Sequence, residues 1–252
     1  MTKKEDIIIT QSPVGMPGRA MLNPFLQQIK EVQELPGSNC YCDGDAMETL
    51  RQKLEEFDAD GIHFIDSGNY HYMSRIWLEK LNTPFRLVVF DNHTDMQPPA
   101  LLPVLSCGSW IRDAAGAYQN IKGICVIGPP EASVRETEAM EHVWFVTQEE
   151  LDDGSGAAKI KEIFASHAGT FPVYLSVDKD ILSKEELDTN WDQGNVRVDE
   201  LLSLAKDCLA GRKVLAVDLC GEPSANAPEA ECSAASLVNQ KLYGALAAKI
   251  ED

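Results

Sequence analysis

The chain has 252 residues, of which 44% are hydrophobic and 25% are charged, a balance typical of a globular protein with a core of ordinary size. Its formal net charge of −18 argues against nucleic acid or an anionic membrane as a partner, because both are bound through clustered basic side chains. No Pro/Gly/Ser-rich linker or repeat divides the sequence, so we expect a single domain over residues 1–252.

The amino terminus and the cysteines indicate the compartment. The first residues, MTKKEDIIITQSP, contain too short an apolar stretch for a signal peptide, and no later run is long enough to cross a bilayer. We therefore expect a cytoplasmic protein. The seven cysteines are an odd number and form no CxxC pair, so we expect free and mostly buried thiols.

Short apolar runs rich in Val, Ile and Phe are continuous rather than alternating, which is typical of strands buried on both faces. The predicted strands are Ile62–Ile65, Leu87–Phe90, Ile124–Ile127, Val143–Val146, Val173–Val177 and Val214–Val217. Segments with helical spacing lie between them, at Ala46–Phe57, Ser74–Leu81, Ala157–Phe164 and Val198–Leu209. This alternation predicts an α/β fold with a parallel sheet covered by helices on both faces.

Acidic residues follow several of the predicted strands directly. Asp66, Asp91, Asp178 and Asp218 each come immediately after the last residue of such a strand. In an open parallel sheet, ligands bind in the crevice beyond the carboxyl ends of the strands. The sequence therefore predicts a polar site at one edge of the sheet.

Three short motifs at this edge carry groups that bind metal ions: GNYH at 68–71, DNHTD at 91–95 and SVDKD at 176–180. The candidate ligands are His71, Asp91, His93, Asp95, Asp178 and Asp180. This mixture of carboxylates and imidazoles suits a pair of Mn²⁺ ions, because structural zinc more often recruits cysteine and magnesium rarely takes two histidines. Taken singly, an Asp at a strand end is often a cap or turn residue, and a lone histidine is often structural.

In order and spacing, the three motifs resemble those of the ureohydrolases, the family of arginase, agmatinase and formimidoylglutamase. DNHTD resembles the DAHxD motif of the family, SVDKD its SxDxD motif, and GNYH its GG-D/N-H motif, with Asn69 in place of the second glycine and Tyr70 before the histidine. The resemblance covers roughly residues 60 to 225. It implies an arginase-like, three-layer α/β/α sandwich around a mostly parallel sheet, with two Mn²⁺ ions.

Carried over position by position, the resemblance implies two overlapping ligand sets. One Mn²⁺ ion would be held by His71, Asp91, Asp95 and Asp178. The other would be held by His93, Asp91, Asp178 and Asp180, so that Asp91 and Asp178 bridge the pair. The implied reaction is hydrolysis of a carbon–nitrogen bond in a linear guanidino, amidino or formimino compound by water activated between the two ions.

The resemblance also implies three catalytic residues, Asp95, Glu222 and His93. Asp95 would move a proton to the leaving nitrogen. Glu222 lies in DLCGEP, residues 218–223, which resembles the late family segment whose glutamate orients the cationic group of the substrate. The alternative for Glu222 is a solvated loop acid before a proline.

Two segments depart from the family pattern and leave the substrate open. Residues 106–112, SCGSWIR, resemble the SxGTxFR stretch of agmatinases and formimidoylglutamases, but Cys107 stands where several relatives have a proton-shuttling histidine. Residues 181–194 lack the usual Asp-Pro pair, and Trp191 there either lines the pocket or is a structural tryptophan. The remaining histidines, which have no partner motif and are interpreted as structural, are His63, His142 and His167.

The expected partner is a small guanidino or formimino substrate, with no nucleic acid and no membrane. The sequence leaves the oligomeric state open, and a homo-oligomer is possible because trimers and hexamers are common among the proteins that it resembles. The altered loops and Cys107 are also compatible with a second function, that of a non-catalytic metal-binding or regulatory member of the same fold. A different binuclear hydrolase, such as a phosphoesterase, is disfavoured by the acidic balance.

Overall fold

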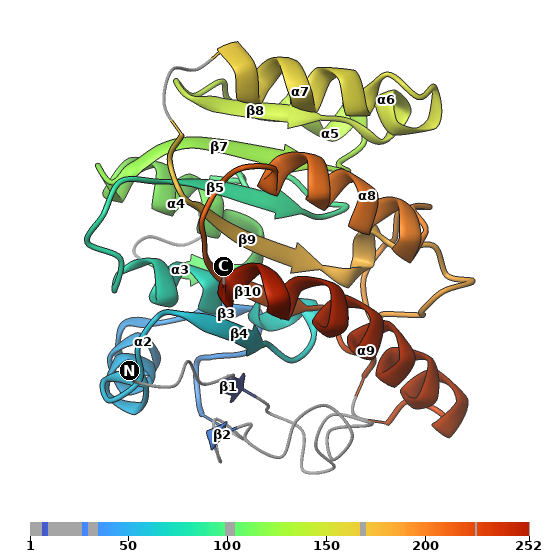
Figure 1. Ribbon diagram of the computed structural model, residues 1–252. Helices are drawn as coiled ribbons and strands as arrows, with labels where there is room; N and C mark the ends of the chain where they lie inside the picture. Colours follow the sequence, from blue (N-terminus) through green and yellow to red (C-terminus); the bar gives the residue numbers. More distant parts are fainter. Residues whose placement is uncertain are drawn as a thin grey trace.

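The computed structural model describes residues 35–98, 104–166, 170–224 and 226–251, together with the backbone of two strands at residues 7–9 and 27–29. Within these ranges eight strands form one sheet in the order β2-β1-β4-β10-β9-β5-β7-β8. Every pairing in this sheet is parallel, and Figure 1 shows the central strands pointing the same way. The strands are β1 (Ile7–Ile9), β2 (Gln27–Ile29), β4 (Gly61–Phe64), β5 (Phe85–Phe90), β7 (Ile121–Ile127), β8 (Val143–Val146), β9 (Val173–Asp178) and β10 (Val214–Cys220).

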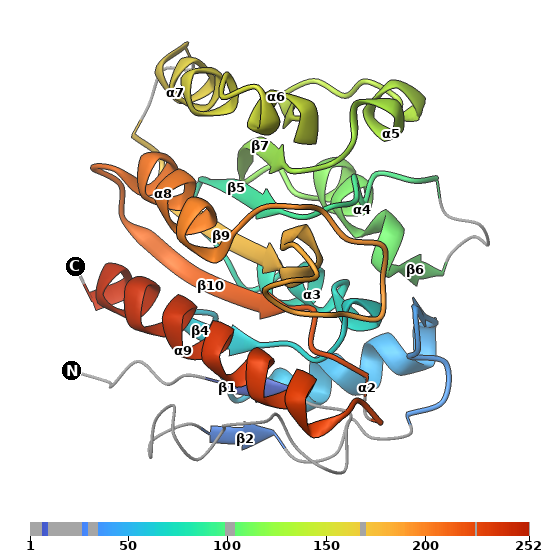
Figure 2. The same ribbon diagram turned by 90° about the vertical axis from the view of Figure 1, so that its right-hand side faces the viewer.

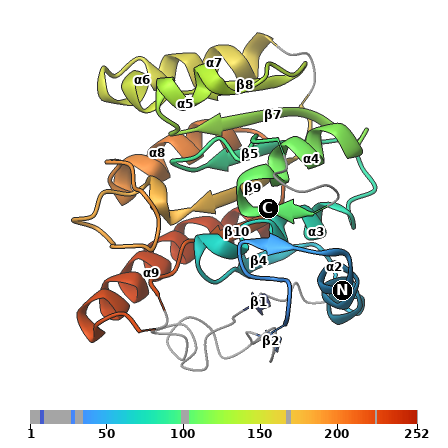
Figure 3. The same cartoon turned by 180° about the vertical axis from the view of Figure 1, so that it is seen from behind.

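Helices cover both faces of the sheet. Figures 2 and 3 show α7, α8 and α9 on one face and α2, α3 and α4 on the other. The helices are α2 (Gly44–Leu54), α3 (Met73–Leu78), α4 (Trp110–Ala117), α5 (Glu131–Glu136), α6 (Gln148–Asp152), α7 (Gly156–Ser166), α8 (Val198–Leu209) and α9 (Glu229–Glu251). Three short 3-10 turns are η1 (Gly68–Tyr70), η2 (Cys107–Ser109) and η3 (Lys179–Ile181).

Two hydrophobic cores hold the layers together, one on each face of the sheet. Ile160, Leu201 and Leu242 belong to the core under α7, α8 and α9. Leu50 and Trp77 belong to the core under α2, α3 and α4. Because both faces are covered, β5 and β9 are buried at every position, as the continuous apolar runs in their sequences predict.

A separate two-stranded ribbon lies beside the sheet. Strands β3 (Tyr41–Cys42) and β6 (Leu105–Ser106) pair in antiparallel fashion, with Tyr41 opposite Ser106 and Cys42 opposite Leu105. The chain before β3 and the turn η2 after β6 both reach the carboxyl edge of the main sheet, where they become part of the site described below.

The structure confirms the predicted fold class, and the three layers are those expected from the sequence. The predicted bounds of β8 and α8 coincide with the observed ones, whereas β5, β7 and β10 extend beyond the predicted runs. Elements missing from the prediction are β1, β2, β3, β6, α4, α5, α6 and α9. No helix among the described residues combines the length and apolarity needed to cross a membrane.

Candidate metal centre

The loops after β4, β5 and β9 bring the predicted ligands to the carboxyl edge of the sheet. His71 follows η1, which itself follows β4. Asp91 comes directly after β5, Asp178 is the last residue of β9, and Asp180 lies in η3. These strands are neighbours or near neighbours in the sheet, so short loops suffice to make residues distant in sequence converge.

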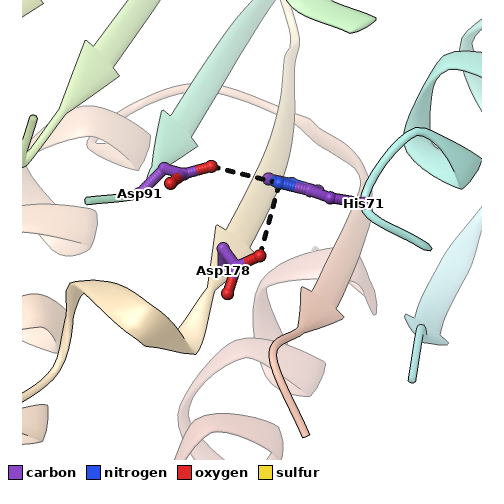
Figure 4. Close-up of side chains that lie close together, drawn as sticks. All are labelled: His71, Asp91 and Asp178. Atoms are coloured by element: carbon purple, nitrogen blue, oxygen red, sulfur yellow. Dashed lines mark ion pairs between the residues drawn. The ribbon is translucent and has the colours of Figure 1, made fainter. Parts of the chain in front are cut away.

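The first group of ligand atoms surrounds the His71 ring, as Figure 4 shows. His71 Nδ1 lies 3.1 Å from Asp91 Oδ2 and 3.5 Å from Asp178 Oδ2. One donor atom from each of these three residues lies within 4.8 Å of the other two, and all three residues are buried. This spacing is suitable for a single cation bound between them.

The second group shares Asp91 with the first. His93 Nδ1 lies 2.9 Å from Asp180 Oδ2 and 3.4 Å from Asp91 Oδ1. Donor atoms of Asp91, His93 and Asp180 again lie within 4.8 Å of one another. Asp91 thus presents one oxygen to each group, whereas Asp178 belongs only to the first, so the predicted bridging by Asp178 stays a prediction.

Backbone amides fix the carboxylates in place. The amide of His93 donates to Asp91 Oδ1 at 2.6 Å, and the amide of Asp180 donates to Asp178 Oδ1 at 3.1 Å. The amide of Asn92 donates to Asp180 Oδ1 at 3.0 Å, which ties the loop after β5 to the turn after β9. The loop after β5 and the turn after β9, which carry most of the acidic ligands, are therefore joined by a hydrogen bond to one of those ligands, Asp180.

Asp95 occupies an unusual position beside the first group. Its φ of +47° is left-handed, a conformation that Asp tolerates better than most residues. Asp95 Oδ2 lies 3.1 Å from His71 Nδ1 and also accepts a hydrogen bond of 2.6 Å from Trp110 Nε1. The indole donor from α4 thus orients this carboxylate toward the histidine.

The charges within the cluster shift its pKa values strongly. Burial alone would lower the pKa of His71, but the neighbouring Asp91 and Asp95 carboxylates raise it well above its usual value. At His93, burial again lowers the pKa, but the Asp180 and Asp91 carboxylates outweigh it and raise the pKa to about 12. Burial together with the charge of Asp91 raises the pKa of Asp95 to about 7. Without a cation the cluster retains protons, which a bound divalent ion would displace.

The donor set fits divalent cations on an observation independent of the motifs. Two carboxylate oxygens lie 3.1 Å from His71 Nδ1, yet this buried nitrogen has no aligned hydrogen-bond partner among the described residues. The other ring nitrogen, Nε2, is hydrogen-bonded to Ser176 Oγ at 2.9 Å. A metal-binding histidine usually has one ring nitrogen held by a hydrogen bond while the other points at the metal site. Here Nε2 is the held nitrogen and Nδ1 points at the carboxylates.

A cavity of about 150 Å³ opens onto the cluster. The ligands His71, Asp91, His93, Asp95, Asp178 and Asp180 line it, together with Cys40, Tyr41, Gly68, Gln97, Ser106, Cys107, Gly108 and Trp191. The ring of Trp191 packs so closely on Gly68 that a Cβ at that glycine would lie 2.8 Å from the indole. Trp191 is therefore a pocket residue, the first of the two alternatives that its sequence position left open.

An amide network closes the rim of this cavity. Asn69 Nδ2 donates to Asn39 Oδ1 at 2.8 Å. Asn69 Oδ1 accepts hydrogen bonds from Trp191 Nε1 and Asn190 Nδ2, each at 2.9 Å. Asn69, which replaces a glycine of the motif, thus connects the segment before β3 with the loop that carries Trp191.

Glu222 is not brought to the cavity. Glu222 Oε1 accepts hydrogen bonds from Lys179 Nζ and from Asn239 Nδ2, and the side chain is buried. Its neighbour Gly221 faces the cluster instead, with a φ of +85° and a position at which a Cβ would lie 2.4 Å from Asp178 Oδ1. The geometry therefore supports neither predicted alternative for Glu222, because the carboxylate is neither beside the pocket nor solvated.

A larger cavity of about 600 Å³ lies between α2 and α4, away from the ligands. Its three arginines are already paired with acids, in the ion pairs Arg51–Glu79, Arg75–Glu79, Arg75–Asp113 and Arg112–Glu138. Paired guanidinium groups of this kind leave little free charge for an anionic ligand. We therefore assign the chemistry to the smaller cavity.

The other histidines are not part of the cluster. His63 is buried, stacks on Trp77 with ring centroids 4.0 Å apart and contacts Asp218 Oδ1 at 2.7 Å. His142 is exposed beside Glu141. His167 lies outside the described residues. For His63 the structural interpretation stands, and its partner Asp218 is one of the acids that follow predicted strands.

Comparison with known proteins identifies the family of the chain. Residues 60–238 match the model of the arginase family. An uncharacterized protein of Thermotoga maritima is 34% identical over 163 residues, which are 65% of this chain and 58% of that protein. The matched stretch thus spans little more than half the length of that relative.

Solved structures with the same fold are far more distant in sequence. Proclavaminate amidino hydrolase of Streptomyces clavuligerus superposes with a TM-score of 0.69 at 16% identity, over 97% of this chain and 91% of that one. Formiminoglutamase of Trypanosoma cruzi with Mn²⁺ has a TM-score of 0.62 at 12% identity, over 96% and 93% of the two chains. The fold agrees throughout, and the family match covers all three motifs and most of the sequence, so the chain belongs to the arginase family.

Proposed function

We propose that this protein hydrolyses a carbon–nitrogen bond in a small linear guanidino, amidino or formimino compound with the help of two Mn²⁺ ions. The observation that carries the proposal is the pair of ligand groups that share Asp91. Two cations held a few ångströms apart by one carboxylate are the arrangement of binuclear hydrolases. Membership of the arginase family favours this reaction over phosphoester cleavage.

Manganese is the preferred metal because of the donor set. The two groups combine carboxylate oxygens with one imidazole each, His71 in the first and His93 in the second. No cysteine belongs to either group among the described residues, which argues against a structural zinc site. A structural neighbour from Trypanosoma cruzi was solved with Mn²⁺, which supports the same choice here.

The protein side chains divide the catalytic work. When bound, the two ions supply the Lewis acidity that makes water a nucleophile at neutral pH. Asp95, oriented beside the cluster by a hydrogen bond from Trp110, is suited to carry a proton to the leaving nitrogen. Trp191 and Gly68 form an apolar wall that limits the access of bulk water to the reacting carbon.

Uncharged groups position the substrate in this proposal. Outside the six candidate ligands, the described lining of the cavity contains neither a carboxylate nor a basic side chain. Gln97, Ser106 and Tyr41 are groups there that can exchange hydrogen bonds with a planar amidine, and Trp191 offers an aromatic face. Orientation by Glu222, which the resemblance implied, is therefore no part of the proposed mechanism.

The test is metal reconstitution followed by a substrate screen. The apoprotein is loaded with Mn²⁺, its metal content is measured, and agmatine, arginine, guanidinobutyrate and formiminoglutamate are assayed for release of urea or formamide. We expect two ions per chain in the wild type and loss of both in Asp91→Asn. Asp58→Asn, an exposed acid beyond the opposite edge of the sheet, is the matched control and should keep both ions.

The same screen separates the second candidate, a non-catalytic metal-binding protein of this fold. The observations that favour it are Cys107, which stands beside the cluster in place of an expected histidine, and the altered loop that brings Trp191 into the cavity. Two bound ions without product from any substrate would support that reading. A protein that binds no Mn²⁺ would contradict both.

A further inference from the structure

Two cysteines face the same cavity as the metal ligands. Cys40 precedes β3 and Cys107 begins η2, and both line the pocket. We propose that Cys40 and Cys107 form a redox modification site in the pocket wall, where the two thiols close to a disulfide on meeting a small disulfide or peroxide oxidant. The proposal goes beyond hydrolysis and does not depend on it, because the bond itself is the quantity measured.

The β3–β6 ribbon brings the two residues together at one of its ends. Tyr41 pairs with Ser106 and Cys42 with Leu105, and Cys40 and Cys107 lie directly beyond the Tyr41–Ser106 pair, at the same end of the ribbon. Cys40 has a left-handed φ of +59° and Cys107 begins η2, yet the amide of Cys107 donates to the carbonyl of Cys40 at 3.0 Å. This backbone hydrogen bond keeps the two residues side by side, as a disulfide requires, with its Cα atoms roughly 4.4–6.8 Å apart.

The side chains approach as well as the backbones. The Cys40 thiol interacts with that of Cys107, and burial nevertheless raises the pKa of both thiols. Cys107 is only 9% exposed, whereas Cys40 is partly exposed at the rim. An oxidant from solvent therefore meets Cys40 first, and Cys107 is the thiol that resolves the adduct.

Oxidised glutathione serves as the oxidant in a balanced exchange. The Cys40 sulfur attacks the glutathione disulfide, forming a mixed disulfide and releasing one reduced glutathione. The Cys107 sulfur then attacks the Cys40 sulfur, forming the protein disulfide and releasing the second glutathione. The protons of the two cysteine thiols end on the two glutathione thiols, and the protein loses two electrons to the glutathione disulfide.

The other cysteines are less suited to this reaction. Cys42, Cys125, Cys208 and Cys220 are buried, and Cys125 and Cys208 lie in the hydrophobic core where no oxidant reaches them. Cys232 is partly exposed, but it lies on α9 and not in the cavity. The chain therefore supplies a matched control, a second accessible thiol without an opposed partner in the ribbon.

A disulfide between Cys40 and Cys107 would change the wall of the cavity. The bond would join Cys40, next to Tyr41 at the start of β3, to the turn η2, which contains Gly108, and both Tyr41 and Gly108 line the cavity. This wall would change from two segments held by hydrogen bonds to one covalently closed ring. Oxidation should therefore alter the shape of the pocket without removing a metal ligand.

The experiment treats the folded protein with oxidised glutathione at pH 8.5, blocks free thiols, and maps the products by peptide mass spectrometry. In the wild type we expect a linked peptide pair containing Cys40 and Cys107, lighter by two hydrogens, and reversal by dithiothreitol. Cys107→Ser should stop at a glutathione adduct on Cys40. Cys232→Ala should form the link as the wild type does.

Equal glutathione labelling of Cys40 and Cys232 in the wild type, with no linked pair, would overturn the proposal. Cys40→Ser, which should leave Cys107 unmodified, guards against a folding defect specific to the Cys107 variant. Mn²⁺ content measured on the same samples separates the two proposals, because a protein that binds no metal can still form the link, and a metal-loaded protein can fail to form it.

Discussion

The hydrogen bond from Trp110 to Asp95 couples a residue outside the candidate ligands to the cluster. Trp110 Nε1 donates to Asp95 Oδ2 at 2.6 Å, and the same indole packs against His71 with ring centroids 4.9 Å apart. Trp110→Phe keeps the packing and removes the donor. Because the acceptor is a buried carboxylate, we expect a loss of about 1.5–3 kcal/mol in the free energy of unfolding.

Urea unfolding of the metal-free protein measures that loss, and Mn²⁺ titration should show weaker binding in Trp110→Phe. Trp77→Phe is the matched control, since Trp77 is equally buried and its indole nitrogen has no hydrogen-bond partner among the described residues. An equal loss in both variants would show that ring packing, and not the hydrogen bond to Asp95, accounts for the effect.

The pKa of Asp95 predicts a pH dependence of metal binding. Its value of about 7 lies well above the usual range, so near pH 7 a substantial fraction of this carboxyl is protonated before metal binds. The pKa of Asp180 is likewise raised, first by burial. Mn²⁺ must displace these protons, so its affinity should rise with pH and weaken as pH falls below 7.

Isothermal titration in two buffers of different protonation enthalpy counts the protons released per ion. We expect net release near pH 6.5 that diminishes toward pH 8, as Asp95 becomes ionised before the metal arrives. In Asp95→Asn the contribution of this carboxyl should disappear from the proton count. A proton count that is the same in that variant and in the wild type would contradict the assignment.

At the scale of elements, the buried Lys179 links η3 to the loop after β10 and to α9. Lys179 lies between the acidic ligands Asp178 and Asp180, and its ammonium group contacts Glu222 in that loop and Asn239 on α9. Lys179→Met would leave Glu222 as an uncompensated buried charge. The expected cost is about 3–5 kcal/mol in the free energy of unfolding.

The double variant Lys179→Met/Glu222→Gln removes both charges and should recover much of that loss, because an apolar or neutral replacement of a buried ion pair is often tolerated. Chemical denaturation of the two single variants and the double variant gives the coupling energy directly. Additive losses in the double variant would mean that the pair does not hold these elements together.

The elements also show where prediction from sequence succeeds and where it stops. Strand β8 and helix α8 were predicted at their observed bounds because each has a clear apolar pattern ended by polar or glycine residues. Helix α9 was missed although its buried residues Val238, Leu242 and Leu246 have helical spacing. The exposed Leu237, 63% accessible, and many alanines blur that pattern in the sequence.

The site shows the same division. The convergence of the six candidate ligands could be predicted because strand order brings successive βα loops to one edge. The direction of the Glu222 side chain could not, because it depends on the buried Lys179 in η3, the turn that follows another strand. The only hint was a lysine between two acidic ligand positions, since a lysine at such a buried place needs a carboxylate partner.

For the whole molecule, the net charge of −18 includes four acids gathered in one buried cluster, so metal should stabilise the fold. If Mn²⁺ binds only the folded chain, an ion at one hundred times its dissociation constant adds about 2.7 kcal/mol per site. Removal of metal with EDTA should therefore lower the melting temperature, and added Mn²⁺ should restore it. Scanning calorimetry measures the shift, and an unchanged melting temperature would contradict the site.

The single domain expected over residues 1–252 stays a prediction, whereas the layered arrangement of the described residues is clear. At the mouth of the cavity, the side chain of Asn69 links two segments that are far apart in the sequence. Asn69 is hydrogen-bonded on one side to Asn39, next to Cys40, and on the other to Trp191. Since one amide side chain binds both segments, its displacement would release the segment before β3 and the loop that carries Trp191 together.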